Sequence, residues 1–284
     1  MNSPPDQALQ NGKADLHIHS NYSDGSFCPE EIFQYAESAN LKALSITDHD
    51  TVAGIDNALK QSERFGIEFI PGLEISARYG RNELHILGYF IDHKNKELLS
   101  YLSFFQEERK KRADKIVHLL NDMGLVITFS EVEEKAYPAA IGRPHIADVM
   151  VDRGIVSTYQ EAFDKYLGDR CPCYVQKYKI YPTDAVQLIN QAGGASFIAH
   201  PGLDIDRDDI NTLIKMGIEG FEAVHPRHTN SQINYYRNVI RENGLLECGG
   251  SDCHGNRKSG PRIGEFCISY DLILRMKKRL KIDA

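Results

Sequence analysis

The stretch ADLHIHS at residues 14–20 decides how the rest of the chain is interpreted. Its apolar and polar residues alternate, which predicts a short strand whose successive side chains point to opposite faces. His17 and His19 are two positions apart, so their imidazoles project from one face and can hold one ion. A solvated histidine pair on an edge strand would have the same spacing, so the remaining sequence has to decide between the two.

After residue 14, short apolar runs alternate with amphipathic segments, the pattern of strands followed by crossover helices in a parallel α/β fold. Seven strand-like runs indicate a barrel or a closely related layout. The predicted strands are 14–20, 42–50, 68–76, 83–90, 195–201, 220–226 and 245–254. The predicted helices between them are 29–40, 51–65, 183–192, 208–216 and 231–243.

The alternation breaks between residues 96 and 180, where no convincing parallel strand occurs. A long charged helix over 96–124 is followed by helical pieces near 143–153 and 158–167. We therefore predict a helical insert over 96–180 that caps the site, within a barrel formed by 14–95 and 181–284, after a flexible tail over 1–13. The charge run at 106–115 is interpreted as a solvated helix face.

Composition limits the class of partner. The net charge of −7 argues against indiscriminate binding to nucleic-acid backbones, but a small phosphorylated substrate is compatible with it. The six cysteines form no paired C-x-x-C sets, which predicts free thiols in a reducing compartment. No apolar run approaches the ~20 residues of a membrane span. We expect a cytoplasmic protein with no membrane association and no stable protein partner.

Histidines stand where the predicted strands give way to polar residues, and carboxylates stand in the same places. In parallel α/β barrels the carboxyl ends of the strands form the active-site face, so these groups are expected to converge. Clustered imidazoles beside carboxylates repel or stay neutral unless a cation joins them, and the mixture suits zinc, manganese or iron. The groups are His17, His19, His49, His85, His200, His225 and His254, with Asp15, Asp48, Asp50, Glu74 and Asp252.

Six motifs in order, DLHIHS with the downstream Asp24, TDHD, PGLE, the isolated His85, AHP and GSDCH, resemble the polymerase-and-histidinol-phosphatase (PHP) family. The resemblance covers residues 14–284 and implies a distorted seven-stranded (β/α)7 barrel with two to three divalent ions, manganese, iron or zinc. It implies three ligand sets: His17, His19, Glu74 and Asp252; Asp24, His49 and His254; and Glu74, His85 and His200, with Glu74 bridging.

Asp24 departs from the pattern of many relatives, which have histidine at this position. It also suits the turn in NYSDGS, since Asp-Gly is favourable turn chemistry. An oxygen ligand here favours manganese or iron over zinc. Through the ion that it would hold, Asp24 is expected to take part in catalysis.

Two or three close ions lower the pKa of a bridging water and neutralise charge on a phosphoryl group, which fits hydrolysis of a phosphate ester by metal-bound hydroxide. No nucleophilic serine or cysteine is needed, and Cys253 is interpreted as structural.

The G-R-P-H segment at 142–145, the Y-V-x-K segment at 174–177 and the E-x-x-H-P segment at 222–226 resemble a subfamily that removes the 3′-phosphate from nucleoside 3′,5′-bisphosphates such as adenosine 3′,5′-bisphosphate. That resemblance implies four phosphate contacts: Arg143, His145, Lys177 and His225. From position alone, Arg143 would be a surface arginine at a helix start.

His225 is also a candidate to protonate the departing ribose oxygen, with His228 a weaker one. Arg257, with Lys258 and Arg262, either meets a 5′-phosphate or belongs to a solvated loop.

Three alternatives stay open. The first is a 5′-to-3′ exonuclease on short 5′-phosphorylated RNA or DNA, and the second is histidinol-phosphate phosphatase. The third is a metal-stabilised interaction module without activity.

Overall fold

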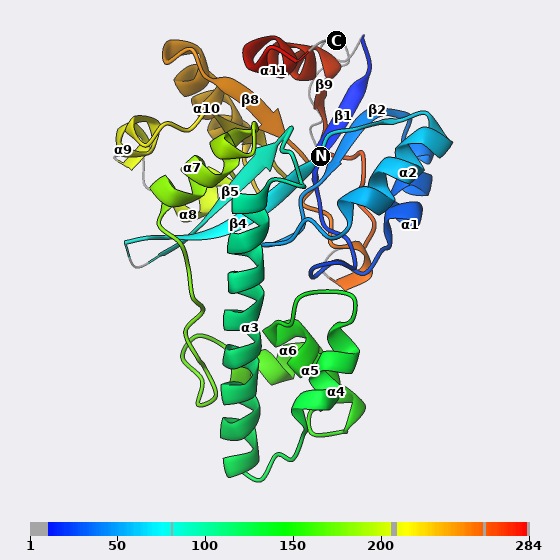
Figure 1. Ribbon diagram of the computed structural model, residues 1–284, viewed down its shortest axis with the longest axis vertical. Coiled ribbons are helices and arrows are strands. Elements are labelled where there is room, and N and C mark those ends of the chain that lie inside the picture. The colour runs from blue at the N-terminus through cyan, green and yellow to red at the C-terminus, as the bar shows by residue number, and fades with distance from the viewer. Residues whose placement is uncertain (1–10, 81, 206–208, 258–259, 283–284) are drawn as a thin grey trace. The chain divides into compact units, whose positions relative to one another are not determined.

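The computed structural model describes residues 11–80, 82–205, 209–257 and 260–282. The chain divides into two compact units (Figure 1). The first unit comprises Met1–Leu99 and Lys179–Ala284, and the second comprises Ser100–Tyr178.

The first three strands of the chain and its last strand form a four-stranded sheet in the order β3-β2-β1-β9. The first three strands are parallel, and β9 pairs antiparallel with β1. Helices α1 and α2 are the crossover connections, and α1 begins at Pro29, where a missing N–H costs nothing. The elements are β1 (Lys13–Ile18), α1 (Pro29–Ser38), β2 (Leu41–Ile46), α2 (Ile55–Phe65), β3 (Glu68–Phe69) and β9 (Ile268–Ser269).

A five-stranded sheet in the order β4-β5-β6-β7-β8 completes the strands of this unit. Strand β5 runs antiparallel to both of its neighbours, whereas β6, β7 and β8 are parallel. The strands are β4 (Gly72–Tyr79), β5 (Asn82–Tyr89), β6 (Ala195–Ile198), β7 (Gly220–Val224) and β8 (Leu246–Gly249). The helices are α7 (Pro182–Gln191), α8 (Pro201–Asp204), α9 (Ile210–Lys215), α10 (Asn230–Glu242) and α11 (Tyr270–Leu280), with a 3₁₀ turn at Gly255–Arg257.

The mixed α/β class predicted from the sequence is confirmed, but the described residues form two sheets rather than one closed seven-stranded barrel. Isolated bridges join the sheets, Ile18 with Cys253 and His49 with Glu74. The predicted strand 68–76 is interrupted at Pro71, which cannot donate to a strand ladder. The predicted strand 83–90 is not parallel, because β4 and β5 form a hairpin.

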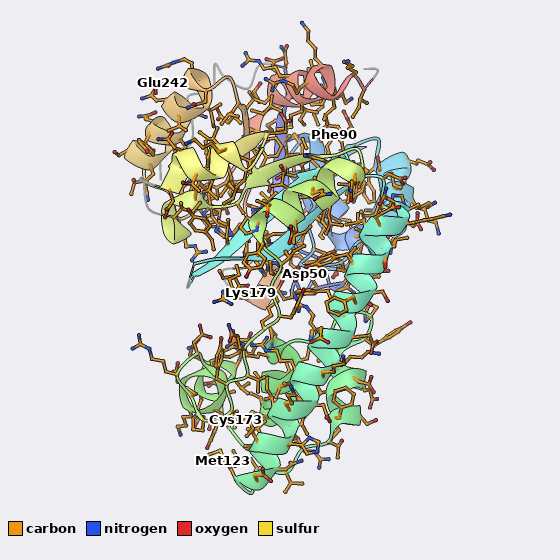
Figure 2. All side chains as sticks on the ribbon, turned by 60° about the vertical axis from the view of Figure 1, so that its left-hand side comes forward. Asp50, Phe90, Met123, Cys173, Lys179 and Glu242 are labelled. Atoms are coloured by element: carbon orange, nitrogen blue, oxygen red, sulfur yellow. The ribbon has the colours of Figure 1, made fainter. Side chains whose placement is uncertain are left out.

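The second unit is helical. Its core includes Ile116, Leu120, Val132, Ile146 and Met150, all buried. Figure 2 labels Met123 and Cys173 in this unit, where their sulfur atoms are 3.6 Å apart. The elements are α3 (Lys96–Asp122, whose first turn belongs to the first unit), α4 (Phe129–Ala136), α5 (Arg143–Asp152), α6 (Tyr159–Ala162) and a π-helix at Phe163–Leu167. Among the residues that the structure describes, no helix combines the length and apolar character needed to cross a membrane.

Candidate metal centre

All nine predicted metal ligands lie in the first unit, on segments that approach one another where the two sheets are bridged. Most follow the end of a strand, but His17 lies within β1, Glu74 within β4 and His85 within β5. In the β4–β5 hairpin Ser76 pairs with His85, so Glu74 and His85 are diagonal neighbours on one face. The antiparallel hairpin, rather than a strand end, brings His85 to the site.

Glu74 is at the centre of the cluster and is completely buried. Its two carboxylate oxygens face five imidazoles, an arrangement that suits a bridging ligand. The distances from Oε2 are 3.4 Å to His17 Nε2, 3.2 Å to His19 Nε2 and 3.1 Å to His49 Nδ1. The distances from Oε1 are 2.9 Å to His85 Nδ1 and 3.4 Å to His200 Nε2.

Two aspartates complete the cluster. Asp252 Oδ1 lies 3.5 Å from His17 Nε2 and 3.3 Å from His19 Nε2. Asp24 Oδ2 lies 3.3 Å from His254 Nε2, and its Oδ1 lies 3.8 Å from His19 Nδ1. The Nε2 atoms of His17 and His19 are 3.2 Å apart, so the pair predicted from alternation along β1 does converge on one point.

The residues fit divalent ions. Several buried ligand atoms find no hydrogen bond among the described residues: His19 Nδ1, Asp24 Oδ1, His49 Nδ1, Glu74 Oε1 and His85 Nδ1. Buried polar atoms that lack hydrogen bonds are costly, and divalent ions held among these atoms would give them partners. Imidazole nitrogen with carboxylate oxygen is a donor set for manganese, iron or zinc.

Ligand atoms within 4.8 Å of one another form three groups among the described residues. These groups are His19, Asp24, His49 and His254; His17, His19 and Asp252; and His49, Glu74 and His85. They overlap with the sets implied by the family resemblance but differ in detail. His49 lies with Glu74 and His85 as well as with Asp24, and His200 Nε2 lies 3.4 Å from Glu74 Oε1.

Protons neutralise the cluster when metal is absent. Burial acts to lower the pKa of His19, but the carboxylates of Asp252 and Glu74 outweigh it and raise that pKa to about 9. Burial is likewise outweighed at His85, where Glu74 and Glu83 raise the pKa to about 10. Burial acts to raise the pKa of Glu74, but the imidazoles of His49, His85 and His17 hold it well below its ordinary value. The metal-free site is therefore an array of buried ion pairs.

Binding of Mn²⁺ to the metal-free protein is expected to release protons near pH 7.5. His19 and His85 are then protonated, since their pKa values are about 9 and about 10, and a metal takes neutral imidazole. The apparent affinity for Mn²⁺ should consequently rise with pH up to about 10, the pKa of His85. Calorimetric titration in buffers of different ionisation enthalpy counts the protons, and binding without proton release would contradict this electrostatic picture.

A buried carboxylate that the sequence analysis did not single out holds His17 in place. Glu222 Oε1 lies 2.9 Å from His17 Nδ1, and its Oε2 accepts a hydrogen bond from the backbone N–H of His200 at 2.6 Å. With Nδ1 protonated and facing Glu222, Nε2 is left to face Glu74 and Asp252. Carboxylates behind ligating histidines orient the ring in this way in metal sites. In the sequence, Glu222 stands out as an ionisable residue within an apolar strand, and a residue of this kind needs a partner when it is buried.

Three carboxylates that were expected to converge on the cluster do not. Asp15 accepts hydrogen bonds from the N–H groups of Ser251 and Gly264. Asp48 accepts hydrogen bonds from both Ser20 and Ser23, and Asp50 accepts two from Ser76. These aspartates fix the loops that carry the ligands, because buried backbone N–H groups there need acceptors.

His225 and His228 lie on the turn after β7, and both are buried. His225 Nε2 is 3.3 Å from Asp252 Oδ2, and its Nδ1 accepts a hydrogen bond from the Arg227 N–H. His228 Nδ1 donates to Ala223 O, and its Nε2 accepts from Gly202 N–H. Both nitrogens of His228 are thus occupied by the backbone, which argues against it as the proton donor, whereas His225 borders the cluster.

Three of the remaining predicted phosphate contacts, Arg143, His145 and Lys177, belong to the second unit. Arg143 Nη1 donates to Leu167 O at 2.9 Å and lies 2.8 Å from Asp169 Oδ1. His145 Nδ1 accepts a hydrogen bond from the Gly142 N–H. Lys177 Nζ lies 5.4 Å from the centre of the Phe105 ring. The side chain of Arg257, the last of these predictions, lies outside the described residues, as does Lys258.

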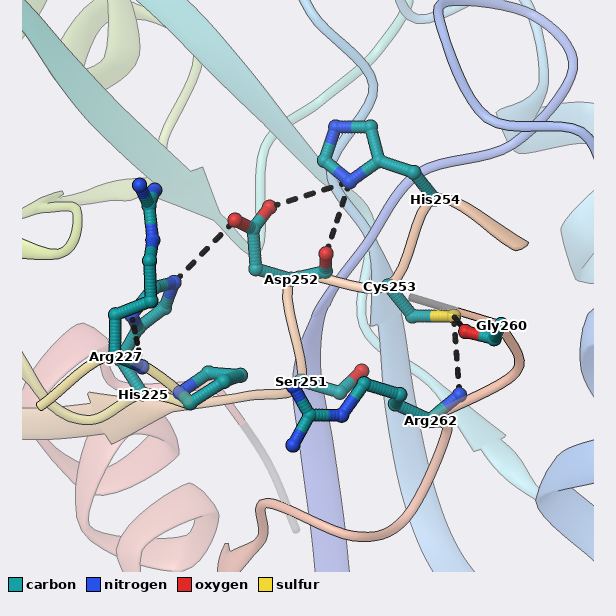
Figure 3. A pocket seen from close by; sticks show the side chains of 9 residues that line it. His225, Arg227, Ser251, Asp252, Cys253, His254, Gly260 and Arg262 are labelled. Carbon is teal, nitrogen blue, oxygen red and sulfur yellow. Dashed lines mark hydrogen bonds and ion pairs between the residues drawn. The ribbon is translucent and has the colours of Figure 1, made fainter. Parts of the chain in front are cut away.

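Two cavities meet at the cluster. One has a volume of about 280 Å³ and is lined by His49, Glu74, Glu83, His85, His200, Arg227, Asp252 and His254. The other, seen in Figure 3, has a volume of about 230 Å³ and is lined by His225, Pro226, Arg227, Ser251, Asp252, Cys253, His254, Gly260 and Arg262. Arg227, Asp252 and His254 border both cavities, so the metal ligands are open to a small molecule.

The site can be compared with known proteins. The model of the PHP domain matches residues 15–167, more than half of the chain. The chain belongs to the PHP family. The matched residues include most of strand β1, strands β2 to β5 and the ligand segments from His17 to His85.

The similarity to several known proteins extends over most of the chain. A 3′,5′-nucleoside bisphosphate phosphatase of Chromobacterium violaceum is 34% identical, covering 88% of this chain and 90% of its own. A 5′-3′ exoribonuclease of Haemophilus influenzae is 32% identical, covering 85% of this chain and 90% of its own. A structure from Bifidobacterium adolescentis, described as a metal-dependent phosphoesterase, has a TM-score of 0.85 at 28% identity, covering 94% and 96% of the two chains. The chain is a metal-dependent phosphoesterase of the PHP family, and therefore a hydrolase.

Proposed function

We propose that this enzyme removes the 3′-phosphate from nucleoside 3′,5′-bisphosphates such as adenosine 3′,5′-bisphosphate, giving the 5′-monophosphate and phosphate. The observation that carries the proposal is the cluster of imidazoles around Glu74, open to cavities of small-molecule size. The similarity to the bisphosphate phosphatase of C. violaceum supports this choice of substrate.

Two to three ions of manganese, iron or zinc are proposed to be held by His17, His19, Asp24, His49, Glu74, His85, His200, Asp252 and His254. When bound, such ions activate water and offset charge on a phosphoryl group. The oxygen donor of Asp24 favours manganese or iron. The protein's own part is to fix the ligands, through Glu222 behind His17 and through Asp48 and Asp50 in the loops.

A covalent cysteine mechanism is disfavoured by the surroundings of Cys253, the thiol that lines a cavity. Burial raises the pKa of this thiol, and its sulfur accepts hydrogen bonds from the N–H groups of Gly255 and Arg262. A thiol of raised pKa is a poor nucleophile. This supports the structural role predicted for Cys253 and direct attack by water.

His225 is proposed as a phosphate contact and as the proton donor to the leaving ribose oxygen, because it borders both Asp252 and a cavity. Arg143, His145, Lys177 and Arg257 are proposed as further phosphate contacts. Arg143 suits the role chemically, since a guanidinium can bind a phosphate through two parallel hydrogen bonds.

The same ligand cluster would also serve the second candidate function, a 5′-3′ exonuclease, which the similarity to the H. influenzae exoribonuclease favours.

We also propose that the first unit is an open form of the PHP barrel and that the enzyme acts in the cytoplasm. The bridges between Ile18 and Cys253 and between His49 and Glu74 support an open form of the distorted PHP barrel. All six cysteines are free thiols, which supports the cytoplasm as the place of action.

Replacing Arg143 with alanine is expected to raise KM for the bisphosphate about 10- to 100-fold and to change kcat little, because uniform substrate binding is lost. Steady-state kinetics measure both constants. Arg153→Ala is the matched control, since Arg153 lies in the same unit and pairs with Glu131 on the surface. Equal values of KM and kcat in Arg143→Ala and Arg153→Ala would show that Arg143 does not bind the substrate.

The proposed function is tested by comparing kcat/KM of Mn²⁺-loaded enzyme on adenosine 3′,5′-bisphosphate, a 5′-phosphorylated short RNA and histidinol phosphate. Release of phosphate and 5′-AMP from the bisphosphate, with the other two substrates at least about 100-fold poorer, is the expected result. Efficient release of mononucleotides from the RNA would establish the exonuclease instead. Turnover of histidinol phosphate alone would overturn both.

A further inference from the structure

The proposed ions are surrounded by carboxylates, which creates a difficulty for an anionic substrate. Asp252, Glu74 and Glu83 all border the larger cavity. A carboxylate that is not neutralised by an ion repels a phosphate that enters this cavity. A positively charged side chain at the rim of the cavity would therefore assist binding. Among the described lining residues of the two cavities, the lysine and arginine side chains are those of Arg227 and Arg262 alone.

Arg227 is the better placed of the two cations. It lines both cavities, whereas Arg262 lines only the smaller one. Arg262 is also engaged elsewhere, since its Nε lies 3.1 Å from Glu265 Oε2 and its guanidinium lies 4.7 Å from the centre of the Phe266 ring. In Figure 3 the side chain of Arg227 extends to the same side as the Asp252 carboxylate, and Arg262 lies on the other side.

The backbone around Arg227 is rigid. Its N–H donates to His225 Nδ1 at 3.2 Å, the preceding residue is Pro226, and His228 is bound to the backbone through both ring nitrogens. The next residue, Thr229, caps helix α10 by accepting a hydrogen bond from the Gln232 N–H. A side chain on such a turn loses little backbone entropy when it binds a ligand.

The guanidinium of Arg227 is exposed and forms no ion pair or side-chain hydrogen bond with any residue that the structure describes. Two other arginines of this unit are paired, Arg237 with Glu247 at 2.9 Å and Arg279 with Glu219 at 3.3 Å. An arginine at the mouth of the site with its donors available has the chemistry to bind two oxygens of one phosphate.

We propose that Arg227 binds the phosphoryl group that is hydrolysed, as a substrate-binding residue supplied by the same unit as the metal ligands. The inference rests on the proposed function in that it requires a phosphate ester at the cluster. It holds for a 3′-phosphate and for a scissile phosphodiester alike, because each presents at least two non-bridging oxygens.

Binding of inorganic phosphate to the Mn²⁺-loaded protein, followed by calorimetry, tests the proposal without reference to turnover. Arg227→Ala is expected to weaken phosphate binding about 10- to 100-fold with an unchanged content of Mn²⁺. Arg227→Lys should recover only part of the loss, because it restores charge but not the two-pronged geometry. Added guanidinium should restore binding to Arg227→Ala. Arg241→Ala is the matched control, since Arg241 donates to Asn238 on α10 and should leave phosphate binding unchanged.

Two results would overturn the proposal. One is phosphate binding by Arg227→Ala that equals that of the unmodified protein. The other is a loss of phosphate binding that accompanies a loss of Mn²⁺ and is not rescued by guanidinium, because Arg227 would then maintain the cluster. If the unmodified protein binds phosphate through Arg227 but does not cleave the bisphosphate, the proposed function fails and this inference stands.

Discussion

Replacing Asp252 with asparagine is expected to lower phosphate-ester hydrolysis about 1,000-fold or more. Asp252 faces His17 and His19 through one oxygen and His225 through the other. Asparagine lacks the negative charge with which Asp252 would hold an ion, and such an ion would supply several kcal/mol of transition-state stabilisation, of which each 1.36 kcal/mol corresponds to a factor of ten. The measurement is kcat/KM on the bisphosphate together with the content of Mn²⁺.

Asparagine is the right substitution because Asp252 has a φ of +47°, a left-handed conformation that asparagine tolerates better than alanine does. A loss of activity can then be assigned to the missing charge rather than to a disturbed loop. Glu219→Gln is the control, a carboxylate of the same unit that pairs with Arg279 and lines neither cavity. Asp252→Asn with more than half of the normal activity and full metal content would contradict its role as a ligand.

Replacing Glu74 with glutamine is expected to have two large effects. Hydrolysis should fall by a similar factor, since Glu74 faces five imidazoles. The metal-free protein should also lose about 3–5 kcal/mol of stability at neutral pH, because protonated histidines would be left buried without their counter-charge. Denaturation of the metal-free proteins measures the second effect.

The pH dependence of this stability loss has a definite sign. The pKa of Glu74 is held below its ordinary value of 4.5, so its contribution is present above pH 4.5 and disappears as the pH falls through the lower folded-state value. The difference between the two proteins should therefore shrink in acid. Glu74→Asp keeps the charge and separates the effects, since it should retain more stability than glutamine while its shorter side chain still impairs hydrolysis. Equal stability of all three metal-free proteins would contradict the ion-pair array.

The sequence allowed much of the cluster to be predicted, because strand geometry is local. Alternation along residues 14–20 places His17 and His19 on one face, and the polar residues after strands place His49 and His254 at a common edge. His85 does lie beside Glu74, but not for the reason that the sequence pattern gives. The pattern predicts a parallel strand, whereas His85 reaches Glu74 across an antiparallel hairpin that only tertiary pairing reveals.

Other features could not be read from residue type or position. Asp15, Asp48 and Asp50 stand in the same sequence context as Asp252, yet they bind loop backbone or serine groups, because the nearest unpaired N–H decides where a buried carboxylate points. Glu222 serves His17 from a strand 205 residues away. Contacts of that separation depend on how the sheets assemble, which no local pattern encodes.

One titration tests most directly whether bound divalent ions carry the chemistry. Metal-free protein is titrated with Mn²⁺ while bound metal and hydrolysis of adenosine 3′,5′-bisphosphate are measured in the same samples, with Asp252→Asn in parallel. We predict that activity is absent without metal, rises as two to three ions bind, and stays absent in the variant. Full activity in the metal-free protein, or saturation of these ligands with no hydrolysis of any phosphate ester, would contradict the account.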